Sequence, residues 1–528
     1  MRGMWLAKEE SVSGRKEGGL EVAVYVFSLL VGYKPNGVDY AQGYRAKILS
    51  KLTCPIRYIF AELPGRSDID FYKSLGIPEE DMFSMYHYLL DHPTIRPTVR
   101  AKDKLAELME SMQLAAVDYQ DSEIRLVKEG WVAAALILVP NDREHLLRIN
   151  YFDHDKLIRT EAYTDQIAYT DYYATVKSEH GPYAKRTRRT YYHKDGSVAY
   201  EQIFTGERFW FLFPDGRVLT KVGLIEAFMK KLALSEKDII LIDRFAQFDY
   251  VQPLFQQKQK ARVIAVMHTG HYFEEGESSY TVNLNQDYNY LFKYSGMLDT
   301  IVVSTQQQKE ELTEKLLEYQ CSVPDIEVIL AGGVERLRYP DRGRKECSML
   351  SVSRIQWHKK LHWLVEGAIK AHKVNEKISL DIYGSGDNNY KNMIENMVEK
   401  HQAQSYVRFM GHQDVTEVYK NYEVFLTAST FETLGLSILE AISSGTAVIG
   451  LDAKYGSRLL VHPEENGYLI DFEPGNVEEE EIIDHLAEKM IEIFADSERL
   501  EKFHECSYEI AEGFSNRTVE DGWGEIFL

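Results

Sequence analysis

Short runs of apolar residues recur along the chain, and most are followed by a polar turn and a segment with apolar residues at helical spacing. Residues 424–426 predict a buried strand, and the segment 436–443 has the spacing of a helix. Gly445 is suited to end that helix, and residues 447–449 predict the next strand. Strands that alternate with helices predict parallel α/β sheets. Further strands of this kind are predicted at residues 22–27, 57–63, 239–242, 262–267, 301–304, 349–352, 380–383 and 407–411.

The pattern changes between about residues 116 and 217, where short segments alternate aromatic or aliphatic residues with polar ones. Residues 194–196 (Lys-Asp-Gly) and 214–216 (Pro-Asp-Gly) are typical of hairpin turns. We therefore predict an antiparallel β-meander inserted into the first α/β half. The basic run of residues 185–189 fits two interpretations, a surface for an acidic partner or a solvated edge strand that resists aggregation.

Composition narrows the class of protein. The chain has 528 residues, 44% hydrophobic and 27% charged, which is typical of a soluble globular protein of about two to four domains. A net charge of −21 argues against non-specific binding of nucleic acid. The four cysteines form no CxxC pair and fit a reducing compartment. No apolar run approaches the ~20 residues that span a bilayer, and residues 1–19 lack the apolar core of a signal peptide. We expect a cytoplasmic protein with a disordered leader.

Two glutamates flank the predicted helix start at Leu434-Gly435-Leu436. Glu432 lies in the loop and Glu440 lies in the helix. Unpaired backbone N–H groups at a helix start suit a phosphate, and carboxylates on either side can accept hydrogen bonds from a sugar and a ribose. Two surface glutamates on an ordinary βαβ unit are the alternative.

Other candidate residues follow predicted strands or open predicted helices. Arg354 and Lys359 lie between the strand 349–352 and a helix, where two cations can neutralise a diphosphate. His268 directly follows a strand, at the sheet edge where open α/β folds bind ligands, and a structural histidine is the alternative. Gly37, at the start of the helix 38–52, allows the backbone to approach a phosphate. Met410 ends a strand and offers backbone contacts to a base.

The apparent cofactor and metal motifs are weak. Gly384-Ser385-Gly386 lacks the third glycine of a dinucleotide fingerprint, so NAD binding is rejected. The Asp-x-Asp strings at residues 68–70 and 153–155 lie far from the other candidates, and His268 and His271 have no third ligand at a suitable spacing. We therefore predict no required metal and no cofactor.

The motifs together resemble one family. Glu432 and Glu440, with seven residues between them, and the Arg354-x4-Lys359 pair resemble family-4 retaining glycosyltransferases of the GT-B fold. The usual Glu-Gly-Phe-Gly is Glu-Thr-Leu-Gly at 432–435 here. The segments 37–45, 268–271, 380–386, 455–456 and 466–470, with the β-rich insertion, are similar to the catalytic subunit of accessory-secretion O-glycosyltransferases, which modify serine-rich repeat adhesins. Wall teichoic acid α-N-acetylglucosaminyltransferases share the insertion and are more distant.

The resemblance implies an α/β chain of the GT-B fold, with two Rossmann-like domains facing a cleft and the β-meander in the first. The leader takes residues 1–20, the first domain residues 21–115 and 218–325, and the insertion residues 116–217. The second domain takes residues 326–510, and a last helix in 511–528 is expected to cross back.

The implied activity is retaining transfer of N-acetylglucosamine or glucose from a UDP-sugar to Ser/Thr of a serine-rich repeat adhesin. A teichoic acid acceptor is the alternative, and a non-catalytic acceptor-binding subunit is a further one. The implied catalytic residues are Glu432, Arg354, Lys359 and His268. UDP-sugar binding is assigned to Gly37, Arg354, Lys359, Gly384, Met410, Glu432, Leu434, Gly435, Leu436 and Glu440.

The aromatic insertion predicts a homo-oligomer or a complex with a sister subunit, and peripheral contact with the membrane stays open.

Overall fold

The computed structural model describes residues 23–28, 37–51, 54–113, 116–179, 181–243, 248–278, 281–473 and 478–527. The leader 1–20 lies outside this range. The chain divides into two compact units, one from residues 1–30 and 53–264 and the other from residues 31–52 and 265–528. This division differs from the expected arrangement of a first domain, an insertion and a second domain. The limits of those domains stay predictions, except the limit at residue 326, which is discussed below.

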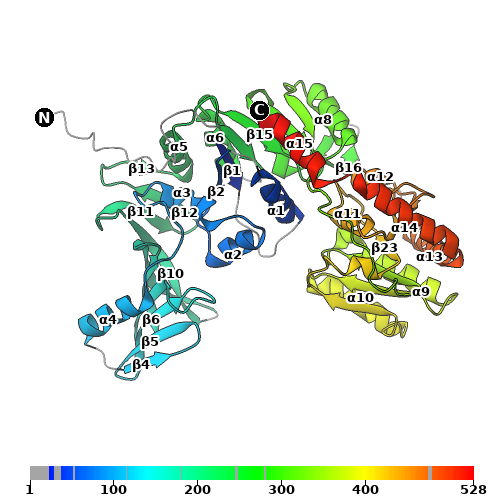
Figure 1. The fold of residues 1–528 in the computed structure, drawn as a ribbon. Coiled ribbons are helices and arrows are strands. Elements are labelled where there is room, and N and C mark those ends of the chain that lie inside the picture. Colours follow the sequence, from blue (N-terminus) through cyan, green and yellow to red (C-terminus); the bar gives the residue numbers. More distant parts are fainter. Residues whose placement is uncertain are drawn as a thin grey trace. The chain divides into compact units, whose positions relative to one another are not determined.

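The first unit contains four parallel strands of a larger sheet (Figure 1). β1 (Val24–Ser28) lies between β14 (Ile239–Ile242) and β2 (Ile56–Phe60), and β2 pairs with β3 (Met82–Ser84). β14 is buried at all four positions, because parallel strands are covered on both faces. The helices associated with these strands are α2 (Arg66–Ser74), α3 (Met85–Tyr88), α5 (Lys221–Leu232) and α6 (Phe248–Gln256), whereas α4 (Ala101–Met112) packs against the insertion.

The predicted insertion is an antiparallel ten-stranded sheet, which confirms that part of the fold prediction. The strands follow one another in chain order across the sheet. They are β4 (Ala116–Tyr119), β5 (Glu123–Lys128), β6 (Trp131–Leu138), β7 (Leu146–Asp153), β8 (Lys156–Tyr163), β9 (Ile167–Ser178), β10 (Gly181–Tyr192), β11 (Val198–Thr205), β12 (Arg208–Leu212) and β13 (Val218–Leu219).

The basic run of residues 185–189 lies on β10, and the edge-strand interpretation of it is wrong. β10 pairs with β9 on one side and β11 on the other, so it is not an edge strand. Arg189 is buried and bonds both carboxylate oxygens of Asp171 at 2.7 Å, so it does not offer its charge to a partner. Arg189, Thr190 and Tyr191 are all buried, so β10 is covered on both faces where Arg189 lies, whereas Lys185 is exposed.

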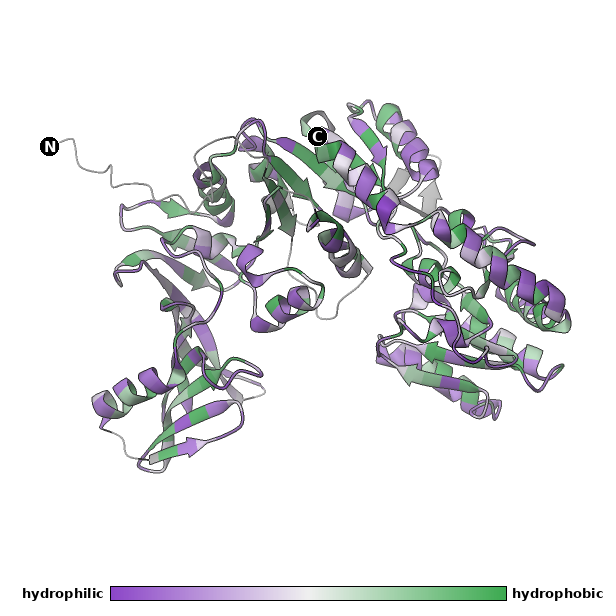
Figure 2. Cartoon of the chain, viewed as in Figure 1, coloured by the Kyte–Doolittle hydropathy of each residue, from purple (hydrophilic) through white to green (hydrophobic). Residues whose placement is uncertain are grey.

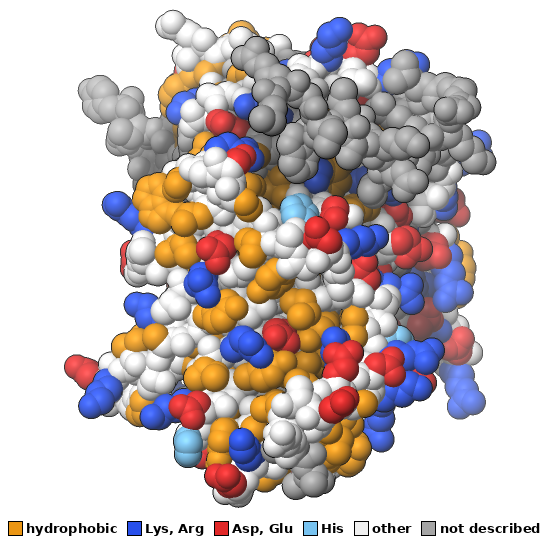
Figure 3. Space-filling view, turned by 90° about the vertical axis from the view of Figure 1, so that its left-hand side faces the viewer, with side chains coloured by type: hydrophobic (Ala, Val, Ile, Leu, Met, Phe, Trp, Pro, Cys, Tyr) orange, Lys and Arg blue, Asp and Glu red, His pale blue; other side chains and the backbone are white. Residues whose placement is uncertain are grey.

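Aromatic side chains fasten the insertion to the first α/β half. The rings of Tyr191 and Tyr200 stack with centroids 4.4 Å apart, and the Tyr200 hydroxyl donates to the carbonyl of Tyr86 in α3. Other aromatic residues of the sheet stay exposed, including Tyr119 and Trp210. The space-filling view in Figure 3 shows hydrophobic side chains mixed with charges of both signs on the face it draws.

In the second unit, β18 (Thr300–Val303) pairs in parallel with β19 (Asp325–Val328). The expectation that a second half begins at residue 326 is therefore wrong, since these residues extend the sheet of β18. β15 (Arg262–Val266) crosses the division between the units, and β16 (Tyr272–Ser278) and β17 (Thr281–Leu284) form a hairpin. The helices here are α1 (Gly37–Leu49), α7 (Asn289–Lys293) and α8 (Gln306–Glu318).

A six-stranded parallel sheet forms the rest of the second unit, in the order β22-β21-β20-β23-β24-β25. The strands are β20 (Ser348–Val352), β21 (Ser379–Tyr383), β22 (Val407–Gly411), β23 (Val424–Thr427), β24 (Ala447–Leu451) and β25 (Gly467–Ile470). Figure 2 shows the hydrophobic strands enclosed by helices with polar outer faces. The helices are α9 (Leu361–His372), α10 (Asn388–Lys400), α11 (Leu436–Ile442), α12 (Gly456–Leu460), α13 (Glu479–Ala495) and α14 (Ser497–Glu512).

The last helix, α15 (Asn516–Phe527), packs against α1, and the guanidinium of Arg45 lies over the ring of Trp523 at 5.7 Å. A helix from the end of the chain thus packs against one from its beginning. None of the helices within the described ranges is long and apolar enough to span a membrane.

Candidate active site

The segment between β23 and β24 forms the frame of the site. β23 is buried at all four positions, and α11 begins after the loop of residues 428–435. Gly435 has a φ of 76°, a left-handed conformation that strains other residues, and a Cβ there would lie 2.9 Å from Cδ1 of Ile438. The glycine in the sequence pattern is therefore required by the turn that opens the helix. Gly445, with a φ of 66°, follows the helix end as predicted.

Glu432 and Lys359 form a direct ion pair. Nζ of Lys359 lies 2.6 Å from Oε1 of Glu432, and the two side chains are 16% and 14% exposed. β20 and β23 are neighbouring parallel strands, so the loops that follow them meet at one edge of the sheet. Burial alone would raise the pKa of Glu432, but the adjacent ammonium of Lys359 outweighs it and holds that pKa below the ordinary value. Glu432 is therefore a carboxylate at neutral pH.

Arg354 lies in the same loop as Lys359 and is exposed. Between them in sequence is His358, whose pKa is lowered to about 4 by desolvation and by the charges of Lys359 and Arg354. The two predicted cations are thus close enough to act on one side chain, and His358 is neutral at physiological pH. Sequence reasoning gave His358 no role.

Two glycines after β21 allow a close approach to the Arg354 loop. A Cβ on Gly384 would lie 1.9 Å from the carbonyl oxygen of Ser353, and one on Gly386 would lie 2.1 Å from that of Ile355. The Ile355 N–H donates to the carbonyl of Ser385 at 3.1 Å. These glycines are needed because two loops run side by side. A contact between Gly384 and a nucleotide sugar stays a prediction.

Glu440 lies on α11, and both of its carboxylate oxygens accept hydrogen bonds from tyrosines. The Tyr44 hydroxyl donates to Oε1 at 2.8 Å, and the Tyr419 hydroxyl donates to Oε2 at 2.9 Å. Burial raises the pKa of Glu440 above its ordinary value, against the opposing effect of these hydroxyls. Sequence reasoning missed both tyrosines. Tyr44 lies within the segment 37–45 that carries the family resemblance, but nothing in that segment points to Glu440.

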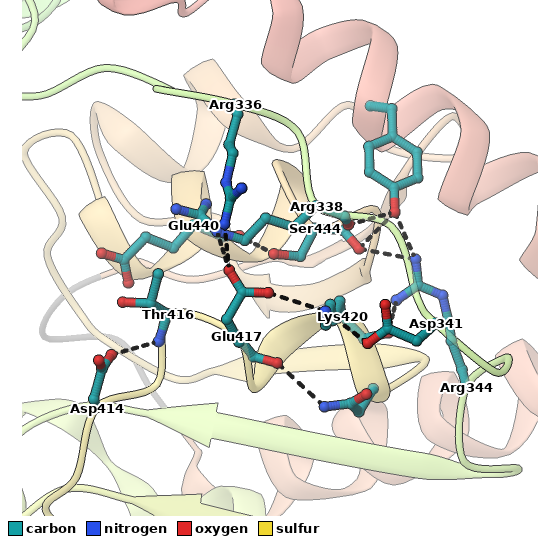
Figure 4. Close-up of polar contacts among 12 residues, drawn as sticks. Arg336, Arg338, Asp341, Arg344, Asp414, Thr416, Glu417, Lys420, Glu440 and Ser444 are labelled. Carbon is teal, nitrogen blue, oxygen red and sulfur yellow. Dashed lines mark hydrogen bonds and ion pairs between the residues drawn. The ribbon is translucent and has the colours of Figure 1, made fainter.

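Figure 4 draws a network of charged side chains from residues 336–344 and 414–420, together with Glu440 of α11. Arg338 lies beside Glu440, and its positive charge opposes the effect of burial on the pKa of that carboxyl. Arg336 contacts Glu417 at 2.9 Å, and Lys420 contacts the other oxygen of Glu417 at 2.9 Å. This network fixes the segment before β20 against the loop before β23.

His268 follows β15, as predicted, and its backbone N–H donates to the hydroxyl of Tyr288 at 2.8 Å. A small cavity beside it is lined by residues of α1, residues 329–331 and α15. His271, in contrast, is fully buried, and burial lowers its pKa to about 4. His268 and His271 thus lie in different surroundings and do not act as a pair.

The remaining predicted residues lie around the same sheet edge or open α1. Gly37 is the first residue of α1, and a Cβ there would meet no atom within 4 Å, so space is open beside it. Met410 lies on the edge strand β22 and is 40% exposed. Leu434 is buried, its carbonyl against Gly456, and Leu436 is the first residue of α11.

The Asp-x-Asp strings have structural roles in the first unit. Asp68 accepts the N–H of Gly65 at 2.7 Å, and Asp70 pairs with Arg66 at 2.7 Å. Asp153 and Asp155 lie at the hairpin between β7 and β8. Within the described residues, no group of three or more His, Cys, Asp or Glu side chains is placed to hold a metal ion.

The site therefore combines a partly buried Lys–Glu pair, an exposed arginine and a second carboxylate held by tyrosines, on one strand–loop–helix unit and its neighbours. Cations of this kind stabilise a departing diphosphate, and carboxylates accept hydrogen bonds from sugar hydroxyls.

Two segments of the chain match known protein-family models. Residues 340–509 match the family model of glycosyl transferases group 1, and residues 117–215 match the GtfA extended beta-sheet domain. The GtfA subunit of the UDP-N-acetylglucosamine–peptide N-acetylglucosaminyltransferase of Streptococcus gordonii is 30% identical over 511 residues, covering 96% of this chain and 98% of that one.

Solved structures of GtfA chains are also similar to this chain over nearly its whole length. The pneumococcal O-GlcNAc transferase GtfA, in complex with UDP and GlcNAc, superposes with a TM-score of 0.84 at 28% identity, covering 96% of this chain and 98% of that chain. The chain in a GtfA/B complex gives a TM-score of 0.84 at 30% identity, covering 96% and 99%. These matches confirm the predicted GT-B fold with its β insertion, and the chain belongs to the GtfA-like family of GT-B glycosyltransferases.

Proposed function

We propose that this glycosyltransferase transfers N-acetylglucosamine from UDP-N-acetylglucosamine to serine and threonine hydroxyls of a serine-rich protein, with retention at the anomeric carbon. The single observation that carries the proposal is the Lys359–Glu432 pair, which holds a cation and a carboxylate 2.6 Å apart at the carboxyl edge of the second sheet. The names of the similar proteins favour N-acetylglucosamine over glucose.

In this proposal the cationic residues contact the diphosphate, and the carboxylates contact hydroxyl groups of the donor. Lys359 and Arg354 face the diphosphate and stabilise the negative charge that grows on it as the glycosidic bond breaks. Glu432 accepts hydrogen bonds from sugar hydroxyls, and Glu440 accepts those of the ribose. Backbone N–H groups near Gly37 and Leu436 contact phosphate oxygens, and His268 approaches the sugar. The base is contacted by the backbone at Met410.

The transfer needs no nucleophile from the protein in this scheme. The acceptor oxygen forms the new bond to the anomeric carbon on the face from which UDP departs, and the old carbon–oxygen bond electrons leave with UDP. The acceptor proton passes to an oxygen of the departing phosphate. The protein contributes orientation and positive charge, which are worth most where water is excluded.

A sister subunit is the partner we propose for the ten-stranded sheet. Support comes from the solved GtfA/B complex of a similar chain and from exposed aromatic residues on the sheet, including Tyr119, Tyr183 and Trp210. Peripheral membrane contact belongs to the same proposal and has no residue that argues for it.

The test is a mass-spectrometric assay with a serine-rich peptide, comparing UDP-N-acetylglucosamine with UDP-glucose, with and without the sister subunit. We expect a mass increase of one N-acetylhexosamine per modified residue. Transfer only to a polyol-phosphate polymer would identify a teichoic acid enzyme instead. UDP binding without transfer to either acceptor in the presence of the sister subunit would indicate a non-catalytic role.

A further inference from the structure

The carboxylate of Glu440 is held from two different parts of the fold. Tyr419 belongs to the same parallel sheet unit as α11 and is 1% exposed. Tyr44 comes from α1, 396 positions earlier in the chain. One oxygen of Glu440 is therefore fixed by its own surroundings, and the other depends on a helix from the beginning of the chain.

The place of the Tyr44 ring is set by packing. A Cβ on Gly332 would lie 3.3 Å from Cδ2 of Tyr44 and 2.8 Å from Cδ2 of Leu436, so the absence of a side chain there leaves room for both. Leu436 opens α11, the helix that carries Glu440. The phenol is thus held in place by the backbone of the 329–333 segment and by the start of α11.

We propose that Tyr44 is a positioning residue for the nucleotide, which acts through Glu440 by fixing the orientation of its carboxylate and keeping it charged. The proposal rests on the function proposed above, in which Glu440 accepts hydrogen bonds from the ribose. Each carboxylate oxygen has two lone-pair sites, so an oxygen that accepts one phenol keeps a second site for a ribose hydroxyl. The two tyrosines leave one such site on each oxygen.

Removing the Tyr44 hydroxyl has a defined electrostatic effect. Burial disfavours the charged form of Glu440, and hydrogen bonds to its oxygens favour it. The charged and titratable groups that act on this carboxyl are Tyr44 and Tyr40 from α1, Tyr419 before β23, Arg338 before β20 and Asp414 after β22. Glu335 acts on Tyr44. Of these, Tyr44 and Tyr419 donate to the carboxylate at hydrogen-bond distance, so loss of either raises the pKa of Glu440 further.

The experiment is calorimetric titration of the full chain with UDP between pH 5.5 and 8, for the wild type and the Tyr44→Phe variant. We expect about tenfold weaker binding of the variant near pH 7, the scale of one hydrogen bond to a charged group. The decline of affinity toward acid should also begin at higher pH in the variant, because Glu440 is protonated more readily.

A matched control removes the same kind of bond elsewhere. In the ten-stranded sheet, Tyr151 and Tyr163 both donate to Oε2 of Glu161 at 2.8 Å, so Glu161 is also held by two phenols. The Tyr151→Phe variant should bind UDP with the wild-type affinity and the wild-type pH profile. A loss equal to that of Tyr44→Phe would mean a general effect on stability and would overturn the proposal.

A double variant separates action through Glu440 from direct contact with the ligand. If Tyr44 acts through Glu440, then Glu440→Gln with Tyr44→Phe binds UDP no more weakly than Glu440→Gln alone. Additive losses would overturn the proposal, as would wild-type affinity and pH profile in Tyr44→Phe. A wild-type chain that binds no UDP at any pH would instead refute the proposed function.

Discussion

Replacement of Lys359 by methionine tests the pair at the centre of the site. The substitution keeps most of the side-chain length and removes the ammonium, which lies 2.6 Å from Glu432. Two effects are expected together. The departing diphosphate loses a stabilising charge, and Glu432 loses the partner that holds its pKa below the ordinary value.

The magnitude follows from the surroundings. Loss of one preorganised charge donor costs about 10²–10³ in turnover, or roughly 3–4 kcal/mol of transition-state stabilisation. Glu432 is 14% exposed, so the unpaired carboxylate is poorly solvated and its pKa rises. The variant should therefore lose turnover on the acid side at a higher pH than the wild type does.

The assay is turnover of UDP-N-acetylglucosamine with a serine-rich peptide between pH 5.5 and 8. The control is Lys360→Met, which removes the same charge from the next residue, where the ammonium instead lies over the ring of Trp363 at 4.8 Å. Lys360→Met should keep turnover within about threefold of the wild type, since the Lys360 ammonium lies over Trp363 and 3.7 Å from Glu479 rather than beside Glu432. Equal turnover in Lys359→Met and Lys360→Met would refute the reasoning.

Three further predictions concern the stability of the fold. Gly435→Ala should reduce turnover and lower the free energy of unfolding by about 1–2 kcal/mol, because φ at this position is 76° and the new Cβ would lie 2.9 Å from Cδ1 of Ile438. Urea titration measures the change in stability. An unchanged urea midpoint together with unchanged turnover would contradict this prediction. Arg189→Met should destabilise the chain by about 3–5 kcal/mol, because the buried Asp171 loses both hydrogen bonds from Arg189, without weakening UDP binding to the folded protein. Arg188→Met is the milder control, since the side chain of Arg188 is 43% exposed. Burial lowers the pKa of His271 from 6.5 to about 4, so His271 takes up a proton in the unfolded chain before it does in the folded one. Stability should therefore fall as the pH drops from 6.5 toward 4, and His271→Phe should show a shallower fall in melting temperature over that range. Parallel curves for the variant and the wild type would contradict the lowered pKa of His271.

Much of the fold was predictable because parallel strands covered on both faces are continuous apolar runs. β14, β23 and β24 follow this rule, and each was recognised from its sequence. β19 has only one buried position, so its pattern did not reveal its neighbour, and it was assigned to the wrong sheet. Strand order depends on pairing between distant segments, which periodicity does not encode.

The part of the site formed by loops at one edge of the second sheet was predictable from the sequence. Lys359 and Glu432 are 73 positions apart, yet each follows a strand whose carboxyl end faces the same edge. The partners of Glu440 could not be found this way. Tyr44 approaches from α1, and Tyr419 looks like a core aromatic residue in the sequence, so neither hydroxyl has a local pattern that marks its bond. Arg189 shows the converse, since of four basic neighbours in the sequence it alone lies in the stretch of β10 that is covered on both faces.

The most direct test of the account is a crystal structure of the chain with UDP bound. The account predicts the ribose hydroxyls within hydrogen-bond distance of the Glu440 carboxylate and the diphosphate beside Lys359 and Arg354. A nucleotide bound away from residues 432–440, or with its diphosphate remote from Lys359, would contradict it.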